Sequence, residues 1–213
     1  VVNMHPWEAN EVPVMLAAAL GSDIPIIVLH LTRPPIEIPD RQAHGMDSHL
    51  MAARGAYVIR PFDEGRPRQG TIIVRGTSST ANIVDLLPWF ADGGPNVKVV
   101  AAVSHELFRR QPQSWKDRVL PDHEWADSMV ISNTARANMA NWYPHAVARD
   151  AALTPDWDDR WRTGGTVDQI VAESHIDAEH QKEAILRFVD QREERFERLR
   201  RLVGEGAAAD LRA

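Results

Sequence analysis

The sequence changes abruptly from strand-forming to turn-forming residues along one stretch, Thr71-Ile72-Ile73-Val74-Arg75-Gly76-Thr77-Ser78-Ser79. Its first half is β-branched and largely apolar, which is typical of a strand that is covered on both faces of a sheet. The glycine and the hydroxyl residues that follow favour a tight turn into a helix. We expect that helix to span about residues 80–90.

Shorter apolar runs on both sides of this stretch predict further strands. They cover Ala56–Ile59, Val97–Val103 and Met129–Ile131, and the sequence Asp92-Gly93-Gly94-Pro95 ends the helix between two of them. Strands that alternate with helices indicate parallel pairing through crossover connections. We therefore predict an α/β fold, a three-layer α/β/α sandwich around a mostly parallel, mixed sheet with a C-terminal helical extension.

The N-terminal residues predict a separate helix and strand. Good helix formers occupy Glu8–Leu20, with Asn10 and Pro13 suited to the first turn. The near-continuous apolar run Ile24–Leu31 predicts a strand covered on both faces. The polar, proline-containing stretch from Thr32 to Ser48 is the best candidate for a linker.

The C-terminal residues are helical in pattern from Thr166 onward. Apolar residues at helical spacing over Asp177–Leu202 predict one helix of about 39 Å. Its polar side mixes opposite charges, which favours a solvated face with (i, i+4) pairs, although a partner-binding helix is an alternative. Gly204–Ala213 is expected to be a frayed tail.

Composition excludes several classes of protein. The chain has 213 residues, a formal charge of −6 and no cysteine. It can therefore form no disulfide, thiolate nucleophile or thiolate zinc site, and it fits a reducing cytoplasm, where we expect the protein. No basic stripe for nucleic acid is present, and the longest apolar runs are too short to span a membrane. No signal peptide is visible, and a start at Val1 without Met suggests a fragment or processed product.

The clusters of histidine, acidic and hydroxyl residues do not have the spacing of a metal site or a hydrolase site. Two histidine pairs are five residues apart, His44 with His49 and His175 with His180. This is not the helical (i, i+4) spacing of a paired site, and we expect no metal. Asp156, Asp158 and Asp159 form an acidic cluster, but Trp157 and Trp161 beside them suggest packing against a neighbouring surface. The run Ser104-His105-Glu106 holds hydrolase residue types, but adjacency in sequence does not create a catalytic triad.

Several short segments are each weak evidence for a family, but their order and spacing along the chain are stronger evidence. They are His5-Pro6-Trp7-Glu8-Ala9-Asn10-Glu11-Val12, Val28-Leu29-His30-Leu31-Thr32-Arg33, Arg54-Gly55-Ala56-Tyr57-Val58-Ile59, residues 71–79, Val97-Lys98-Val99-Val100, His105-Glu106-Leu107-Phe108 and Trp115-Lys116-Asp117-Arg118-Val119-Leu120-Pro121. Their order and spacing resemble the last third of transketolases. The resemblance fades after about Asn133, so the subfamily stays open.

The resemblance implies a division of the chain and a reaction for the complete enzyme. Residues 1–47 would be the tail of the pyrimidine-binding domain with a linker, 48–203 a transketolase C-terminal-like domain, and 204–213 a flexible tail. The complete enzyme would transfer a two-carbon ketol unit between sugars, with the organic chemistry supplied by its cofactor. Thiamine diphosphate and Mg²⁺ would be bound upstream of Val1, so this fragment would bind neither and would not be catalytic alone.

The partner implied is the remainder of the same polypeptide or a partner subunit, with a homodimer expected for the complete enzyme. Its interface would use the sheet edge or the segment Trp142–Trp161. Two alternatives stay open. The homodimeric first component of 2-oxo acid dehydrogenases and deoxyxylulose-phosphate synthase share this architecture, and the chain could also be a non-catalytic docking or regulatory α/β module.

Two positions are candidate site residues. His5 stands where the family typically has an arginine that grips the substrate phosphate, and a mostly neutral histidine there puts a sugar-phosphate substrate in doubt. The alternative is that His5 only precedes a helix. The loop of Gly76, Thr77, Ser78 and Ser79 suits an anion or regulatory ligand because free amides gather where a parallel strand meets a helix. Ordinary helix capping is the alternative there.

Overall fold

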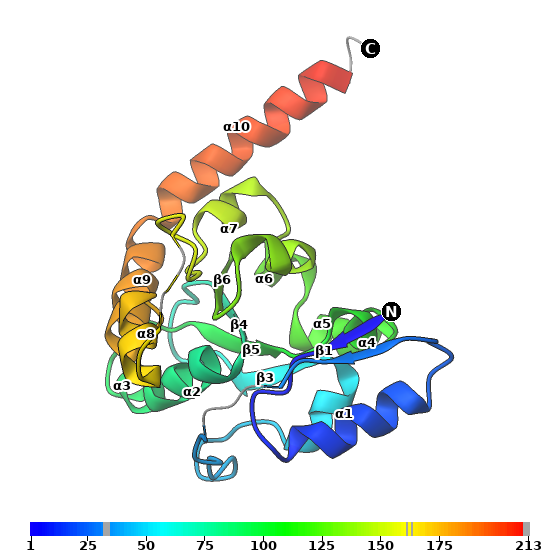
Figure 1. Cartoon of the computed structure of the whole chain (residues 1–213). Helices are drawn as coiled ribbons and strands as arrows, with labels where there is room; N and C mark the ends of the chain where they lie inside the picture. The colour runs from blue at the N-terminus through cyan, green and yellow to red at the C-terminus, as the bar shows by residue number, and fades with distance from the viewer. Residues whose placement is uncertain (32–34, 161, 163, 211–213) are drawn as a thin grey trace.

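The computed structural model describes residues 1–31, 35–160, 162 and 164–210. Its centre is a four-stranded sheet in the order β3-β5-β4-β6 (Figure 1). The strands are β3 (Ala56–Arg60), β4 (Thr71–Arg75), β5 (Lys98–Ala102) and β6 (Ser128–Ser132). Strand β4 pairs in parallel with both β5 and β6, while β3 pairs antiparallel with β5. The predicted mixed, mostly parallel α/β sheet is confirmed.

Every residue of β4, β5 and β6 is buried, as expected for parallel strands with both faces covered. Ile73 is aligned with Val100 on one side and with Val130 on the other. These three side chains belong to one continuous apolar core. Apolar burial along the central strands therefore holds the sheet in this register, because a shift by one residue would exchange its two faces.

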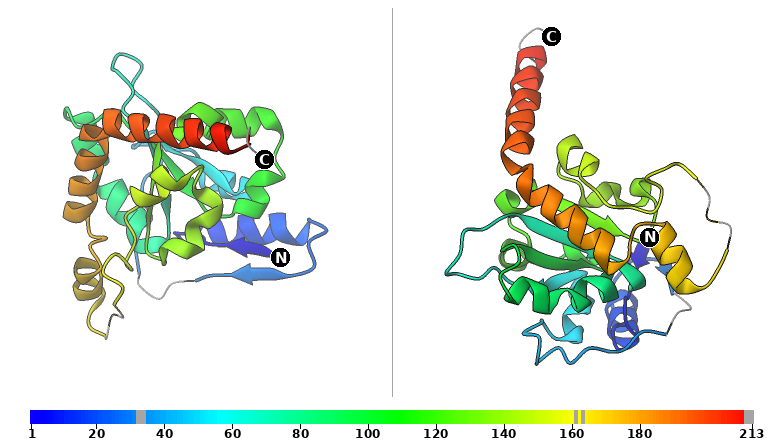
Figure 2. Two further views of the ribbon diagram at one scale, coloured as in Figure 1. Left: turned by 90° about the horizontal axis from the view of Figure 1, so that it is seen from above. Right: turned by 90° about the vertical axis from the view of Figure 1, so that its left-hand side faces the viewer.

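Helices cover both sides of the sheet (Figures 1 and 2). One side carries α2, α3, α8 and α9, and the other carries α4, α5, α6 and α7. The bounds are α2 Thr77–Asp85, α3 Leu87–Ala91, α4 His105–Arg109, α5 Gln113–Val119, α6 Asp122–Ala126, α7 Ala146–Asp150, α8 Val167–Glu173 and α9 Ala178–Asp190, with short 3-10 helices at His49–Arg54 (η1) and Arg136–Trp142 (η2).

The N-terminal residues form a small parallel pair of strands beside a helix. Strand β1 (Val2–Met4) pairs with β2 (Ile27–Leu29), and α1 (Glu11–Leu20) packs against η1. The prediction of a strand over Ile24–Leu31 covered on both faces is wrong in extent and burial. Strand β2 has three residues and is half-buried, because β1 is its only strand partner among the residues described.

Two predicted helices are interrupted. The helix expected over residues 80–90 starts earlier, at Thr77, and α2 gives way to α3 at Leu86, close to Pro88, which has no N–H to donate. The single long helix expected over Asp177–Leu202 is wrong. It is divided at Gln191 into α9 and α10 (Arg192–Asp210).

Helix α10 leaves the body of the molecule and ends far from it (Figure 1). Its first turns are tied to the sheet by Asp127, which accepts from Arg192 Nε at 2.7 Å and from Arg195 Nη2 at 3.0 Å. These ion pairs connect the first turns of α10 to the residue that precedes β6. The helix continues through Asp210, where a frayed tail was expected from Gly204 on, and alanines in this part favour the helical state.

Candidate functional site

A cleft lies at the carboxyl ends of β4, β5 and β6. The chain passes from β4 to β5 on one side of the sheet and from β5 to β6 on the other side. In the sheet, β4 lies between β5 and β6. Open α/β sheets bind ligands at such a switch point, because the two connections diverge and leave a crevice. The cleft has a volume of about 350 Å³ and is lined by Asn3, His5, Pro6, His30, Leu31, Arg75, Gly76, Thr77, His105, Glu106, Asn133, Thr134, Asn138, Asn141 and Trp142.

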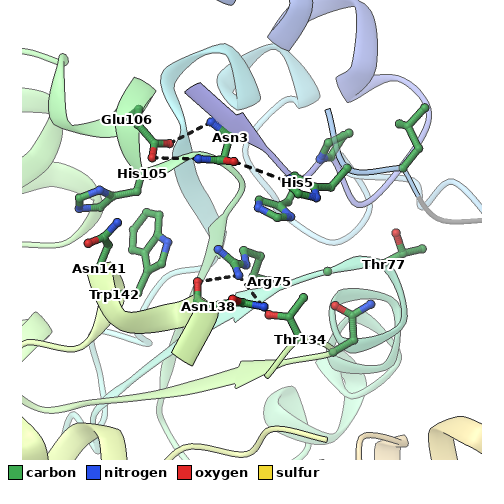
Figure 3. Close-up of a pocket in the computed structure, with 15 residues that line it drawn as sticks. Asn3, His5, Arg75, Thr77, His105, Glu106, Thr134, Asn138, Asn141 and Trp142 are labelled. Atoms are coloured by element: carbon green, nitrogen blue, oxygen red, sulfur yellow. Dashed lines mark hydrogen bonds between the residues drawn. The ribbon is translucent and has the colours of Figure 1, made fainter. Parts of the chain in front are cut away.

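Arg75, the last residue of β4, occupies the middle of this cleft (Figure 3). It is only 7% exposed. Its Nη2 donates to Thr134 Oγ1 at 3.1 Å and to the Asn138 carbonyl at 2.9 Å, whereas its Nε has no partner. No carboxylate of the described residues forms an ion pair with it. Burial lowers the pKa of Arg75 to about 10, which still leaves the guanidinium charged at neutral pH.

His5 reaches the same cleft from the end of β1 (Figure 3). Its backbone N–H donates to the Val103 carbonyl at 2.7 Å, which ties the N-terminal segment to the end of β5. Its ring stacks on His30 with the centroids 4.1 Å apart. Burial, and then the charges of Arg75 and His30, lower the pKa of His5 to about 3. The His5 imidazole is therefore neutral at neutral pH, and its role as a substrate contact stays a prediction.

Glu106 is the acidic side chain of the cleft, and Asn3 engages both of its oxygens. Glu106 Oε2 accepts from the Asn3 backbone N–H at 3.2 Å, and Oε1 accepts from Asn3 Nδ2 at 3.4 Å. The carboxylate therefore faces Asn3 (Figure 3). On the same side, the His105 ring meets Trp142 edge-on at 5.4 Å, and burial lowers the pKa of His105.

The four residues of the predicted ligand loop, Gly76 to Ser79, lie in different surroundings in the structure. Gly76 and Thr77 line the cleft, Ser78 lines a neighbouring hollow, and Ser79 is fully buried with its Oγ lacking a hydrogen-bond partner. Gly76 is the N-cap of α2, and no side chain caps this helix end, so side-chain capping does not explain the loop. Gly76 has φ +99°, and a Cβ there would lie 1.7 Å from Asn133 Oδ1.

Sequence reasoning missed the residue at the centre of the cleft. Arg75 was assigned only to a strand, and Asn133, Asn138 and Asn141 were not singled out at all. One signal was present, because a charged residue that ends an otherwise apolar parallel strand falls at the edge where ligands bind. Asn133 follows β6, and Asn138 and Asn141 belong to η2, and no local pattern places any of them near the end of β4.

The other predicted clusters have structural partners. The His175 and His180 rings stack at 4.1 Å, and His180 Nδ1 lies 2.5 Å from Asp177 Oδ2. Ser104 Oγ accepts from the Leu107 N–H as the N-cap of α4. Within the described ranges, no group of three or more His, Asp or Glu side chains could hold a metal ion, and no helix is long and apolar enough to cross a bilayer.

The tryptophans expected at a neighbouring surface differ in their exposure. Trp142 is buried in the core, whereas Trp157 is 48% exposed and stacks on His175 at 4.2 Å. Trp161 lies outside the described residues. Of these two tryptophans, Trp157 therefore has an exposed ring, and Trp142 does not.

Comparison with known proteins gives one relative in sequence and several in structure. No protein-family profile matches the chain. A transketolase from Geobacillus stearothermophilus is 30% identical over 118 residues, which is 55% of this chain and 17% of that protein.

Solved transketolases share the fold over most of the chain. The enzyme from Leishmania mexicana has a TM-score of 0.69 at 18% identity and covers 90% of this chain with 25% of its own. A Pichia stipitis transketolase gives 0.65 at 18% identity over 89% of this chain and 25% of that chain, and the Campylobacter jejuni enzyme gives 0.57 at 15% over 87% and 26%. The chain spans about a quarter of these structures. This chain is therefore similar in sequence and in fold to a part of transketolases.

Proposed function

We propose that this chain is the C-terminal part of a thiamine-diphosphate-dependent transferase that moves a two-carbon ketol unit between sugars. The observation that carries the proposal is the sequence match to a transketolase combined with a common fold over nearly the whole chain. The chain matches only 17% of that relative, so the complete activity would require the remainder of the enzyme.

The residues that line the cleft do not match the metal ligands expected for the cofactor of transketolases. Mg²⁺ on a diphosphate is usually held through carboxylates together with phosphate oxygens. Among the described residues, one carboxylate lines the cleft, that of Glu106, and Asn3 donates to both of its oxygens. We therefore assign no step of the reaction to a cofactor bound by these residues, and we propose that the cofactor is held outside this chain.

The contribution that we propose for this chain is a wall of the substrate site. His5 would meet the substrate as a neutral hydrogen-bonding group, since burial and Arg75 keep its imidazole uncharged. A neutral ring suits a hydroxyl group better than a phosphate. The hydrogen bond from His5 to the Val103 carbonyl would hold this wall against the sheet.

Calorimetry with thiamine diphosphate and Mg²⁺ tests the proposal first. The chain alone should not bind the cofactor tightly and should not turn over a ketose. A hybrid that joins this chain to the preceding part of the Geobacillus stearothermophilus transketolase should bind the cofactor, and the same preceding part without any C-terminal partner is the control. Tight cofactor binding or ketose turnover by the chain alone would overturn the assignment.

The genomic sequence before the Val1 codon separates the alternatives. A continuous reading frame with an upstream Gly-Asp-Gly motif supports the transferase and removes the docking or regulatory module. The identity of the upstream domains would likewise distinguish a transketolase from the first component of a 2-oxo acid dehydrogenase.

We also propose that the complete enzyme is a cytoplasmic homodimer. The lack of cysteine supports the compartment. The half-exposed ring of Trp157 supports a contact surface near this residue. Analytical ultracentrifugation of the chain and of a Trp157→Ala variant tests the second point. A concentration-dependent dimer that the variant weakens supports it, and a monomer at high concentration contradicts it.

A further inference from the structure

We propose that the cleft at the carboxyl ends of β4, β5 and β6 binds a phosphoryl group, with Arg75 as its charged contact. This inference goes beyond the proposed function, because it assigns a ligand to the described part of this chain without any cofactor. It rests on three features of the cleft. They are a buried cation that forms no ion pair with a carboxylate of the described residues, donors that converge from separate elements, and an acidic group whose two oxygens accept hydrogen bonds from Asn3.

The buried cation is the first feature. Arg75 is 7% exposed and has no carboxylate partner among the described residues, and its Nε lacks a hydrogen-bond acceptor. Burying a charge is costly unless the charge is paired. Two neutral acceptors, Thr134 Oγ1 and the Asn138 carbonyl, satisfy only Nη2. An anion in the cleft would pair directly with this guanidinium, which can hold a phosphate through two parallel hydrogen bonds.

The convergence of donors is the second feature. Besides Arg75 from β4, the cleft is lined by Asn133 and Asn141 from the segment after β6 and by the start of α2, a helix of nine residues. The amino end of a helix carries partial positive charge and attracts phosphate. Gly76 lets this end approach Asn133 closely, since a Cβ at this position would overlap the Asn133 side chain.

The electrostatic balance of the lining is the third feature. Glu106 is the one acidic residue that lines the cleft within the described ranges, and Asn3 binds both of its oxygens. His5 is neutral, so it neither repels an anion nor replaces Arg75 as the cation. The charge of Glu106 acts on Arg75 without an ion pair between the two residues, so Arg75 and the start of α2 remain the positive groups of the cleft.

The shape of the site favours a phosphoryl group over a carboxylate. Its donors come from three separate elements, whereas the two oxygens of a carboxylate match a single planar fork. A volume of about 350 Å³ lies within the range of small-molecule sites. It would hold a phosphate monoester of a small molecule as well as inorganic phosphate.

Thermal unfolding of the complete 213-residue chain tests the site. We expect inorganic phosphate to raise Tm progressively with its concentration, beyond sodium chloride of equal ionic strength. Arg75→Met should lower the apparent phosphate affinity by about tenfold or more, because it removes a charge-assisted contact. Arg68→Met is the matched control, since Arg68 is largely exposed and lies before β4, at the other end of the strand.

A purely structural role of Arg75 makes a different prediction. If Arg75 only held Thr134 and Asn138, Arg75→Met would lower Tm equally in chloride and in phosphate. The site predicts instead that the gap between wild type and variant widens as phosphate is added. Arg75→Lys provides a second test that keeps the buried charge. It should retain phosphate protection at reduced affinity, because an ammonium lacks the planar fork.

Further ligands identify the source of the phosphoryl group. Glycerol 3-phosphate that protects better than inorganic phosphate, with glycerol inactive, indicates a phosphate monoester, and equal protection indicates free phosphate. Acetate that protects as well as phosphate would overturn the phosphoryl assignment. Phosphate that acts no better than chloride, or that protects Arg75→Met as well as wild type, would overturn the site. None of these measurements involves a cofactor or a ketose, so their failure leaves the proposed transferase role untouched.

Discussion

The substitution Glu11→Gln should flatten the dependence of stability on pH. Glu11 is fully buried at the start of α1, where Tyr57 Oη donates to its Oε1 at 2.5 Å and the Trp7 N–H donates to its Oε2 at 3.0 Å. Arg41 Nη2 also lies 3.0 Å from Oε1. Burial outweighs these contacts and raises the pKa of Glu11 from 4.5 to about 7.

The sign of the effect follows from this shift. Between pH 4.5 and about 7 the folded chain keeps a proton on Glu11 that the unfolded chain has lost. The stability that this group contributes is therefore fully present below pH 4.5, the pKa in the unfolded chain, and is lost as the pH rises to about 7, the pKa in the folded chain. The difference between the two pKa values corresponds to about 3 kcal/mol.

Urea unfolding at several pH values measures this contribution. The free energy of unfolding of wild type minus that of Glu11→Gln should fall by about 3 kcal/mol from acid to neutral pH. Taking the difference cancels the histidines, including His5, whose lowered pKa acts in the opposite direction. Glu193→Gln, on the exposed face of α10, is the control and should leave the profile unchanged. A Glu11→Gln profile parallel to that of wild type would refute the reasoning.

Three further outcomes are expected from the packing. Gly76→Ala should lower the free energy of unfolding by about 1–3 kcal/mol and displace Asn133, because alanine disfavours φ +99° and its Cβ would overlap Asn133 Oδ1. Calorimetry measures this effect as a lower Tm, and an unchanged Tm would contradict it. Asp127→Asn should release α10 and speed amide exchange there, since it weakens both arginine contacts of Asp127, while protection in β4 stays as it was. Ile73→Ala should cost about 2–5 kcal/mol in urea unfolding, and a loss below 1 kcal/mol would show that the central strand is less tightly packed than described.

The candidate site was predictable only in part. The resemblance to transketolases singled out His5, and the change at Gly76 singled out the start of α2, and both lie in the cleft. That His5 contacts a substrate stays a prediction. The sequence predicts for Arg75 only the end of a strand, because nothing near it in sequence shows that its charge is buried without an ion pair to a described carboxylate.

The sequence by itself determined the local elements of the sheet. The runs that became β4, β5 and β6 are apolar at every central position, and such runs exclude water whatever their neighbours are. The turn after β4 was equally local, because glycine tolerates a positive φ that other residues resist.

Only the tertiary structure decided the cleft and the course of the last helix. Asn3, Arg75 and Asn138 lie far apart along the chain and meet where strand ends converge. The break before α10 coincides with ion pairs to Asp127, more than sixty positions earlier in the sequence. Hydrophobic periodicity reports one segment at a time, whereas burial of a charge and pairing of ions depend on which segments the fold brings together.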